Sequence, residues 1–538
     1  MTSARGVLVI TAAVSAVLAG WLWDLQRRAP EEEQLEIFGR LFIHGDAPAA
    51  WLFLPILALA CWPPLQRVSL RFARAVGEHP LAAAGVSAAA FALGARLIYQ
   101  GHPLSLDEYA PVFQSELFAA GQLTAHAPPG VLDFVLPRDM QEFFFSVSRP
   151  TGEIASGYWP GFALLLTPFS WLGAPWLLNP LIGGATIWLV HRTALALFAS
   201  RELAGLCALI TLGSAAIAIN AFSFYAMPAH LLLNLAFAAL LAQPSARHAL
   251  AAGALGSLAL TLHNPLPHVL FAAPWLVWLA LRADRARTLP ALAAGYLPLV
   301  LLLGVGWSAL LAGFAGGSAG TAARATELGA VFAWPSAVIV VVRAIGFAKL
   351  WLWAAPAAPL LALLGLRAAR RDVRLLLWAA SAALTALGYF FVPFDQGHGW
   401  GYRYFHSAWA AFPLLAAAAI HAAPVERARA ELSGFAAACA LASLVLLVPL
   451  RAQQVHAFIA AHLAQLPRAE RGTPELVLVN TAAGYYTIDL VQNDALFARR
   501  PLVMESLGAA ADAEMRRAHF PNLVLLAADE PGQVWGRR

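Results

Sequence analysis

The chain has 538 residues, of which 60% are hydrophobic and only 12% are charged, and its formal net charge is +5. Because soluble proteins carry about 25% charged residues, this composition excludes a water-soluble globular protein. The positive charge does not indicate nucleic-acid binding either, because the basic residues are almost all arginines in short loops between apolar runs.

Apolar runs long enough to cross a bilayer, about 17–25 residues each, recur along most of the chain. Since the lipid core offers no water to backbone groups, these runs are expected to be helices. Two shorter apolar pieces, 159–172 and 335–348, are flanked by Pro or Gly and are predicted to lie at the membrane surface or to re-enter it. We predict thirteen spans, at residues 6–23, 50–66, 80–99, 174–198, 203–219, 227–243, 249–262, 266–282, 289–312, 349–367, 373–392, 404–423 and 433–450.

Arginines gather in alternate loops of this pattern, which predicts that those loops are cytoplasmic. The N-terminus is then cytoplasmic and the C-terminal segment lies outside. The arginines are Arg67, Arg71, Arg74, Arg282, Arg285, Arg287, Arg367, Arg370, Arg371, Arg374, Arg427 and Arg429.

The last part of the chain differs from the rest. The runs "ELVLVN" and "NLVLLAA" are typical of short buried strands, and "GAAADAEMRRAHF" between them is typical of a helix. We therefore predict an all-α polytopic domain at 1–450 with a large external loop at 100–158, followed by a small external α/β domain at 451–538.

The external loop contains "LSLDEYAPVFQSELFAAG", residues 104–121. Ser105 and Glu108 match an S-x-x-E capping box, which would give Glu108 a structural role at a helix start. The box does not need Asp107, which would gain only ~0.3–1 kcal/mol from the helix dipole. Asp107 is therefore the first candidate for chemistry and Glu108 the second. The pair could also hold one divalent cation such as Mg or Mn, although no stronger metal motif is present.

Other polar residues are expected on the same side of the membrane. Tyr158 precedes a Trp-containing helix and would suit either the headgroup layer or a substrate contact, and His126 is a further candidate contact. The last external loop, "FDQGHGWGYRYFHS" at 394–407, places Arg403 between Tyr402 and Tyr404, and all three are candidate substrate contacts. An arginine there suits the bidentate binding of phosphate, or it only reaches the headgroups.

Arg343 and Lys349 lie near the external end of another predicted span. They are six residues apart, so on a continuous helix they do not share a face, and at most one is expected to point inward. Either is a second candidate for phosphate, and headgroup contact is the alternative for whichever faces lipid.

Together these pieces resemble the polytopic glycosyltransferases of the GT-C superfamily, in particular the bacterial relatives of protein O-mannosyltransferases and aminoarabinose transferases. The motifs that carry the resemblance are "DEYAPVFQSELFAAG" (107–121), "SGYWPGFALLLTPFSWLGAPWLLNPL" (156–181) and "GYRYF" (401–405), in this order. Two departures are that the acidic pair follows the third span and not the first, and that "HNP" (263–265) stands where relatives often have Arg-Pro.

The resemblance implies a bacterial inner-membrane enzyme that moves a sugar from a polyprenyl-phosphate donor to an acceptor hydroxyl on a lipid, protein or glycan at the external face. It also implies that Asp107 is the general base. Burial beside an apolar interface is expected to raise the pKa of Asp107 toward a useful value, and Arg403 would stabilise the phosphate leaving group. One base without a second nucleophile predicts inversion. The alternatives are a flippase for lipid-linked glycans, a glycan ligase, and an acidic loop that serves only as a scaffold.

Overall fold

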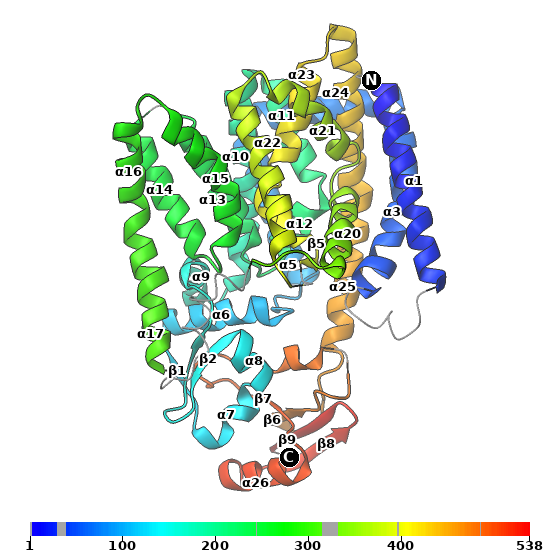
Figure 1. Cartoon of the computed structure of the whole chain (residues 1–538). Coiled ribbons are helices and arrows are strands. Elements are labelled where there is room, and N and C mark those ends of the chain that lie inside the picture. The colour runs from blue at the N-terminus through cyan, green and yellow to red at the C-terminus, as the bar shows by residue number, and fades with distance from the viewer. Residues whose placement is uncertain are drawn as a thin grey trace.

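The computed structural model of the chain describes residues 3–28, 39–243, 245–314, 332–394, 397–484 and 486–537. Most of these residues are helical, and the longer helices run side by side in one bundle. Shorter helices and small sheets cover one end of the bundle, where the C-terminus also lies (Figure 1). The predicted helical architecture with several apolar spans is confirmed, but the part at 1–450 is not all-α, because small sheets form within 125–156 and 398–402.

The predicted number of thirteen spans is not confirmed. Among the described helices, seven stretches are long and apolar enough to cross a membrane, or nine if two bent pairs each count as one span. The bent pairs are α11 (Arg201–Leu212) with α12 (Ala215–Phe222), at 59°, and α20 (Ala337–Trp353) with α21 (Ala358–Ala369), at 102°. The seven are α1 (Ala4–Arg28), η1 (Gly39–His44) with α3 (Gly45–Ala60), α5 (Pro80–Leu97), η3 (Pro175–Leu177) with α10 (Leu178–Phe198), α16 (Arg285–Leu299) through η4 (Val300–Gly306) to α17 (Trp307–Phe314), α22 (Val373–Gly388) with η5 (Tyr389–Phe391), and α24 (Glu426–Ala442) through η7 (Ser443–Leu447) to α25 (Val448–Leu463).

Several predicted spans are shorter in the structure or differently bounded. The span predicted at 50–66 is Arg40–Ala60, because Pro63 and Pro64 begin a separate helix, α4 (Pro63–Glu78). The span predicted at 404–423 shrinks to α23 because a 3-10 helix, η6 (Arg403–Ala408), precedes it. The remaining apolar helices are α9 (Gly161–Trp171), α13 (Met227–Leu241), α14 (Ala246–Thr261), α15 (Leu266–Leu281) and α23 (Ala411–His421).

Helix α20 runs without interruption through the boundary predicted at 348/349, and the chain breaks only after Trp353. Pro356 disfavours a helical backbone at the residue before it, and Ala357 has a left-handed backbone with φ of 69°. The bend therefore follows from local backbone restrictions. It also places Arg343 and Lys349 on one continuous helix.

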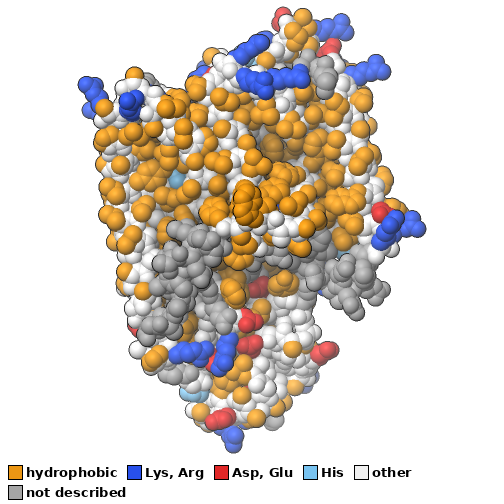
Figure 2. Space-filling view, in the orientation of Figure 1, with side chains coloured by type: hydrophobic (Ala, Val, Ile, Leu, Met, Phe, Trp, Pro, Cys, Tyr) orange, Lys and Arg blue, Asp and Glu red, His pale blue; other side chains and the backbone are white. Residues whose placement is uncertain are grey.

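The two ends of the bundle differ in charge. Figure 2 shows hydrophobic side chains over the middle of the visible face, with Lys and Arg gathered at the end that carries the N-terminus. The opposite end carries helix α6 (Leu106–Ala119), which lies across the bundle, and the sheets below it (Figure 1). An apolar belt between two polar ends is what a multi-pass membrane protein requires.

Two sheets lie at the end of the molecule that carries α6. The first has the order β1-β3-β2, with β1 (Ala125–His126) and β2 (Phe145–Ser148) antiparallel to β3 (Glu153–Ser156). The second has the order β7-β6-β9-β8, in which β6 (Thr473–Val479) is parallel to β7 (Leu502–Glu505) and antiparallel to β9 (Gly532–Arg537). Strand β8 (Val524–Asp529) pairs with β9, and α26 (Ala509–His519) connects β7 to β8.

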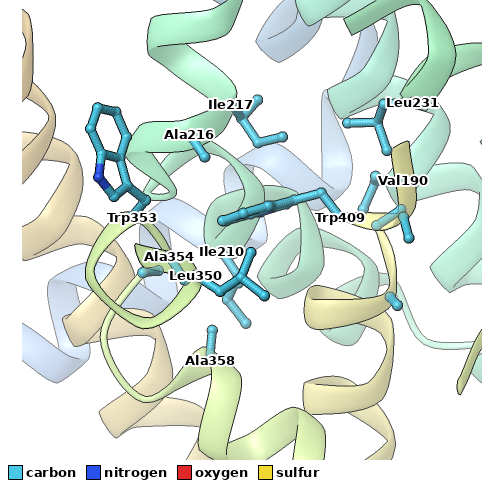
Figure 3. Close-up of a cluster of buried hydrophobic side chains, with 14 of the residues drawn as sticks. Val190, Ile210, Ala216, Ile217, Leu231, Leu350, Trp353, Ala354, Ala358 and Trp409 are labelled. Atoms are coloured by element: carbon cyan, nitrogen blue, oxygen red, sulfur yellow. The ribbon is translucent and has the colours of Figure 1, made fainter. Parts of the chain in front are cut away.

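The interior of the bundle is packed from elements far apart in the chain. Figure 3 shows Trp409 among small and branched side chains. These come from α10, α11, α12, α13 and α20, and they include Val190, Ile210, Ile217, Leu231 and Leu350. All of these side chains are buried, so the segments that lead to the external loops are fixed by a continuous core.

Candidate active site

The acidic pair lies in the first turn of α6. Ser105 is the N-cap, and the predicted capping box with Glu108 is confirmed. Ten of the residues of α6 are buried, including Glu108, so the helix is embedded between the bundle and the sheets at this end of the molecule. Asp107 and Glu108 therefore have fixed and different directions.

Glu108 is fully buried and accepts hydrogen bonds from four donors. The Tyr99 hydroxyl donates to Oε1 at 2.9 Å, and the Phe224 amide donates to the same oxygen at 2.8 Å. The amides of Leu104 and Ser105 donate to Oε2 at 2.9 and 3.3 Å. This carboxylate joins the end of α5, the start of α6 and the loop before α13, which is a structural role.

Asp107 receives a different set of partners. The Tyr158 hydroxyl donates a short hydrogen bond to Oδ1, and Nη1 of Arg403 donates to Oδ2 at 3.0 Å. The Asp107 side chain is 25% exposed, whereas that of Arg403 is 14% exposed. The structure thus brings together three residues that the sequence predicted separately, from α6, from the segment before α9 and from the last external loop. Asp107 remains accessible to a reactant.

The backbone of a tight hairpin positions Arg403. Strands β4 (His398–Gly399) and β5 (Gly401–Tyr402) pair antiparallel, and the amide of Arg403 donates to the carbonyl of Gly397 at 2.8 Å. Gly397 and Gly401 have φ of 107° and 88°, which only glycine adopts readily. The guanidinium lies over the Tyr225 ring, 5.0 Å from its centroid, and this cation–π contact fixes it further.

His263 is a further neighbour of Asp107, as are Tyr225 and the buried Asp489 of the C-terminal segment. The ring of His263 lies against that of Tyr158, with 3.9 Å between the centroids. Burial lowers the pKa of His263 to about 4, although the charge of Asp107 opposes the shift. The ring is therefore neutral at pH 7 and can orient Tyr158 without adding charge.

The two carboxyl groups have opposite electrostatics. Burial works against ionisation of Asp107, but the charge of Arg403 and the hydrogen bond from Tyr158 outweigh it, so the pKa falls below its ordinary value of 3.8. Burial raises the pKa of Glu108 to about 7 in spite of its four donors. The expectation that burial would raise the pKa of Asp107 is therefore wrong, because the paired guanidinium has the larger effect.

The tyrosines beside Arg403 belong to its support. Tyr402 is buried against Gly346 of α20, where any larger residue would collide with the ring. Tyr404 stacks on Tyr389, with 4.2 Å between the centroids, and the guanidinium of Arg343 lies 4.8 Å from the Tyr404 centroid. These contacts fix the hairpin, and whether either tyrosine also touches substrate stays a prediction.

Arg343 and Lys349 are both fully buried, so the expectation that at most one of them points inward is wrong. Arg343 donates to the backbone carbonyls of Tyr389, Val392 and Phe394, which lie at the end of α22 and just beyond it. Carbonyl groups at a helix end are natural partners for a guanidinium. Because these contacts engage Arg343 at the end of α22, its proposed role in phosphate binding has no support from geometry.

Lys349 lies in a buried ion cluster. Its Nζ is 3.3 Å from Oδ2 of Asp46 on α3, and Arg451 of α25 is 2.7 Å from the other oxygen. Trp353 also donates to Asp46, at 2.7 Å. This cluster gives Lys349 a structural partner in place of the predicted phosphate. His126, on the edge strand β1, is exposed and stands opposite Glu153 in the sheet, away from the contacts of Asp107.

The residues that sequence reasoning missed are mostly tyrosines. Tyr99 ends the apolar run before the loop, and Tyr225 stands just before the Met227-Pro228 start of α13. Tyr225 accepts a hydrogen bond from the Ser105 hydroxyl at 3.1 Å and supports Arg403. A polar aromatic residue at an external span end was the available signal, but such residues are common at membrane interfaces and do not stand out.

The acidic pair does not fit the divalent cation that the sequence left open. Each oxygen of Asp107 and of Glu108 already accepts from a protein donor, and the two groups have separate partners. Across the described ranges, no group of three or more His, Cys, Asp or Glu side chains is placed to hold a metal ion. The part of the site that reactants can reach is therefore an ionised carboxylate beside a guanidinium, which suits proton removal next to an anionic leaving group.

The fold and the site together define a bundle of apolar helices with a carboxylate–arginine pair beneath a helix that lies across one of its ends. No family model and no curated protein matches the chain in sequence. Among solved structures, the crystal structure of ArnT from Cupriavidus metallidurans bound to undecaprenyl phosphate is similar, with a TM-score of 0.50 and 12% identity over 84% of this chain and 96% of that chain. The apo structure of ArnT has a TM-score of 0.48 and 14% identity, over 84% of this chain and 97% of that chain. At such identity the similarity to the lipid-bound structure shows the fold alone, so the chain shares the fold of ArnT.

Proposed function

We propose that this chain is a glycosyltransferase that moves one sugar, a hexose or a pentose, from a polyprenyl-phosphate donor to an acceptor hydroxyl. The observation that carries the proposal is the Asp107–Arg403 pair, an accessible carboxylate with its guanidinium at 3.0 Å. The fold of ArnT, whose structure holds undecaprenyl phosphate, supports a polyprenyl-phosphate lipid as the donor carrier. The acceptor is a hydroxyl of a lipid, a protein or a glycan.

In this mechanism Asp107 removes the proton of the acceptor hydroxyl while the hydroxyl oxygen attacks C1 of the sugar. The bond from C1 to the phosphate oxygen breaks, and its electron pair leaves with the polyprenyl phosphate. A single displacement with one base inverts the anomeric configuration. Glu108 is buried behind four donors and offers no second nucleophile for a double displacement.

Arg403 serves two purposes in this proposal. Nη1 holds Asp107 in its ionised form, and Nε is buried without a hydrogen-bond partner among the described residues. A guanidinium has five N–H donors, so the remaining ones are available to the phosphate. Charge that develops on the leaving phosphate would then be stabilised without reorganisation of the site.

The proposed location is a bacterial inner membrane, with the arginine-containing loops and the N-terminus in the cytoplasm. The acidic pair and the α/β domain at 451–538 then face the periplasm, where acceptors arrive from water and the donor from the bilayer. We assign no step to a divalent cation.

The test is a transfer assay with the purified protein in lipid nanodiscs. Polyprenyl-phosphate sugars are supplied together with envelope lipids, proteins and polysaccharides, and products are analysed by mass spectrometry. We expect an acceptor to gain the mass of one sugar residue with release of an equal amount of polyprenyl phosphate. Movement of the lipid-linked sugar across a bilayer without a covalent product would indicate a flippase. Transfer of a whole oligosaccharide would indicate a ligase, and either result would contradict the proposal.

A further inference from the structure

A cavity of about 660 Å³ lies on the side of α6 that faces away from Asp107. Its walls come from α6, from the end of α9 and the segment that follows it (170–176), from the end of α5 and from the 492–499 loop of the C-terminal segment. Tyr109, Val112 and Glu116 of α6 line it. They form one stripe of the helix, because residues three or four apart share a face, whereas Asp107 projects about 200° from Tyr109.

The aromatic walls of this cavity are held in place. Nε1 of Trp171 donates to the carbonyl of Ala119 at 2.9 Å, although the Trp171 side chain is 66% exposed. The guanidinium of Arg96 lies 5.3 Å from the Trp176 ring centroid. Because these rings need not be ordered on binding, a flat ligand would bind at a smaller entropic cost.

The C-terminal segment closes the cavity through direct bonds to α6. The Tyr109 hydroxyl donates to the carbonyl of Asn493 at 2.8 Å and accepts from its amide at 2.9 Å. The amide of Ala495 donates to Oε2 of Glu116 at 2.9 Å. The cavity therefore exists only where the membrane domain and the C-terminal domain meet.

Polar groups in the cavity remain available to a ligand. Among the described residues, neither Arg96 nor Arg499 donates a side-chain hydrogen bond to protein, and Oε1 of Glu116 accepts none. Asp494 also lines the cavity, so two arginines face two carboxylates and the charges balance. Such a mixture does not select an anion such as phosphate, but it can both donate to and accept from neutral hydroxyl groups.

We propose that this cavity is a carbohydrate-binding site that holds the non-reacting part of the acceptor. The apolar face of a sugar ring would pack on Trp171 or Trp176, while its hydroxyls bond to Arg499 and Glu116. The volume lies within the range of about 300–1,000 Å³ typical of small-molecule sites. Identification of the ligand as the acceptor rests on the proposed function, since α6 carries the cavity on one face and Asp107 on another.

The first test measures binding without catalysis. Saturation-transfer-difference NMR is recorded on the full chain in nanodiscs with a panel of neutral, amino and acidic monosaccharides and disaccharides. We expect at least one sugar to bind the wild type and Asp107→Asn. Trp171→Ala and Arg499→Ala should weaken binding about tenfold, the loss of roughly one good contact. Trp334→Ala and Arg500→Ala are matched controls, because Trp334 is 89% exposed and neither residue lines the cavity.

A wild type that binds no sugar of the panel, or an Arg499→Ala variant that binds as the wild type does, would overturn the proposal. So would binding that inorganic phosphate displaces and excess sugar does not.

The second test links the cavity to transfer. Arg499→Ala should raise the KM for the acceptor about tenfold and leave kcat and the KM for the donor unchanged. Sugar binding without any transfer activity would overturn the proposed function and the acceptor assignment but support the carbohydrate site. Transfer with an unchanged acceptor KM would overturn the acceptor assignment alone.

Discussion

Asp107 and Glu108 are neighbours in the sequence, yet they share no partner. Glu108 closes a capping box and joins three segments, whereas Asp107 faces Tyr158 and Arg403. The capping box could be predicted from sequence because its spacing is local. The sequence predicted that the loops of Asp107 and Arg403 lie on the same side of the membrane, but it did not predict that the two side chains pair. The cation–π contact of Tyr225 with Arg403 could not be predicted, because it depends on how a distant loop packs.

The different pKa values make the identity of the base measurable. Because the pKa of Asp107 lies below 3.8, it stays ionised in mildly acidic solution. We predict that protonation of the base does not lower kcat/KM between pH 8 and pH 5. If Glu108 were the base, the rate would fall on the acid side of about pH 7. Burial raises the pKa of the neighbouring Asp489 to about 8, so the pH–rate profiles of the wild type and of Asp489→Asn are compared. A decline centred near pH 7 in both would contradict the assignment to Asp107.

Arg403→Ala tests the cause of the low pKa of Asp107. Without the guanidinium, the charged carboxylate loses its main stabilising partner, so the pKa should rise and the acidic decline should move to higher pH. Activity should also drop about 10²–10³-fold, because the phosphate loses its electrostatic partner. A variant with the rate and pH profile of the wild type would show that Arg403 does not act on Asp107.

At the scale of helices, the buried cluster of Asp46, Lys349 and Arg451 links α3, α20 and α25. Removal of the single anion leaves two buried cations unpaired, which typically costs about 3–5 kcal/mol. We predict that Asp46→Asn strongly lowers the thermal stability of the purified protein. Lys349→Met should cost less, because Asp46 keeps Arg451 and the hydrogen bond from Trp353.

The half-buried pair of Asp372 and Arg374 provides the control for this measurement, because asparagine can replace Asp372 as the N-cap of α22. Asp372→Asn should change stability by less than about 1 kcal/mol, as is usual for surface ion pairs. If Asp46→Asn unfolds at the wild-type temperature, the cluster does not hold the three helices together.

Sequence reasoning located most of the apolar helices but not how they break. The bend after α20 follows from Pro356 and the left-handed Ala357, and only the proline is visible in the sequence. The prediction that separates 335–348 from 349–367 failed because hydropathy does not report where a helix stops. Hydropathy also does not report that Arg343 and Lys349 both point inward, because their partners come from the distant elements α22, α3 and α25.

For the whole molecule, the class of a polytopic helical protein could be predicted from composition, whereas the number of spans could not. Hydropathy counts every apolar run, but several of these runs form short or bent helices in the structure. The contact between α6 and the 492–495 segment was also beyond sequence reasoning, because it joins residues more than 370 positions apart. That contact creates the cavity proposed to bind carbohydrate.

The proposed orientation can be tested by cysteine labelling in a Cys61→Ser background, because Cys61 is exposed whereas Cys207 and Cys439 are buried. We predict that Arg517→Cys reacts with an impermeant maleimide in spheroplasts. Arg371→Cys should react only after the membrane is permeabilised. The opposite pattern would place the acidic pair in the cytoplasm and contradict the proposed location.

The most direct measurement for the account as a whole is the rate of sugar transfer by Asp107→Asn. Asparagine keeps the shape of the side chain and can still accept from Tyr158, but Arg403 loses its anion, so thermal stability is measured alongside activity to show that the variant is folded. We predict that kcat falls about 10²–10⁴-fold, the usual contribution of a general base, while binding of polyprenyl phosphate persists. A correctly folded variant that transfers sugar at nearly the wild-type rate would contradict the account.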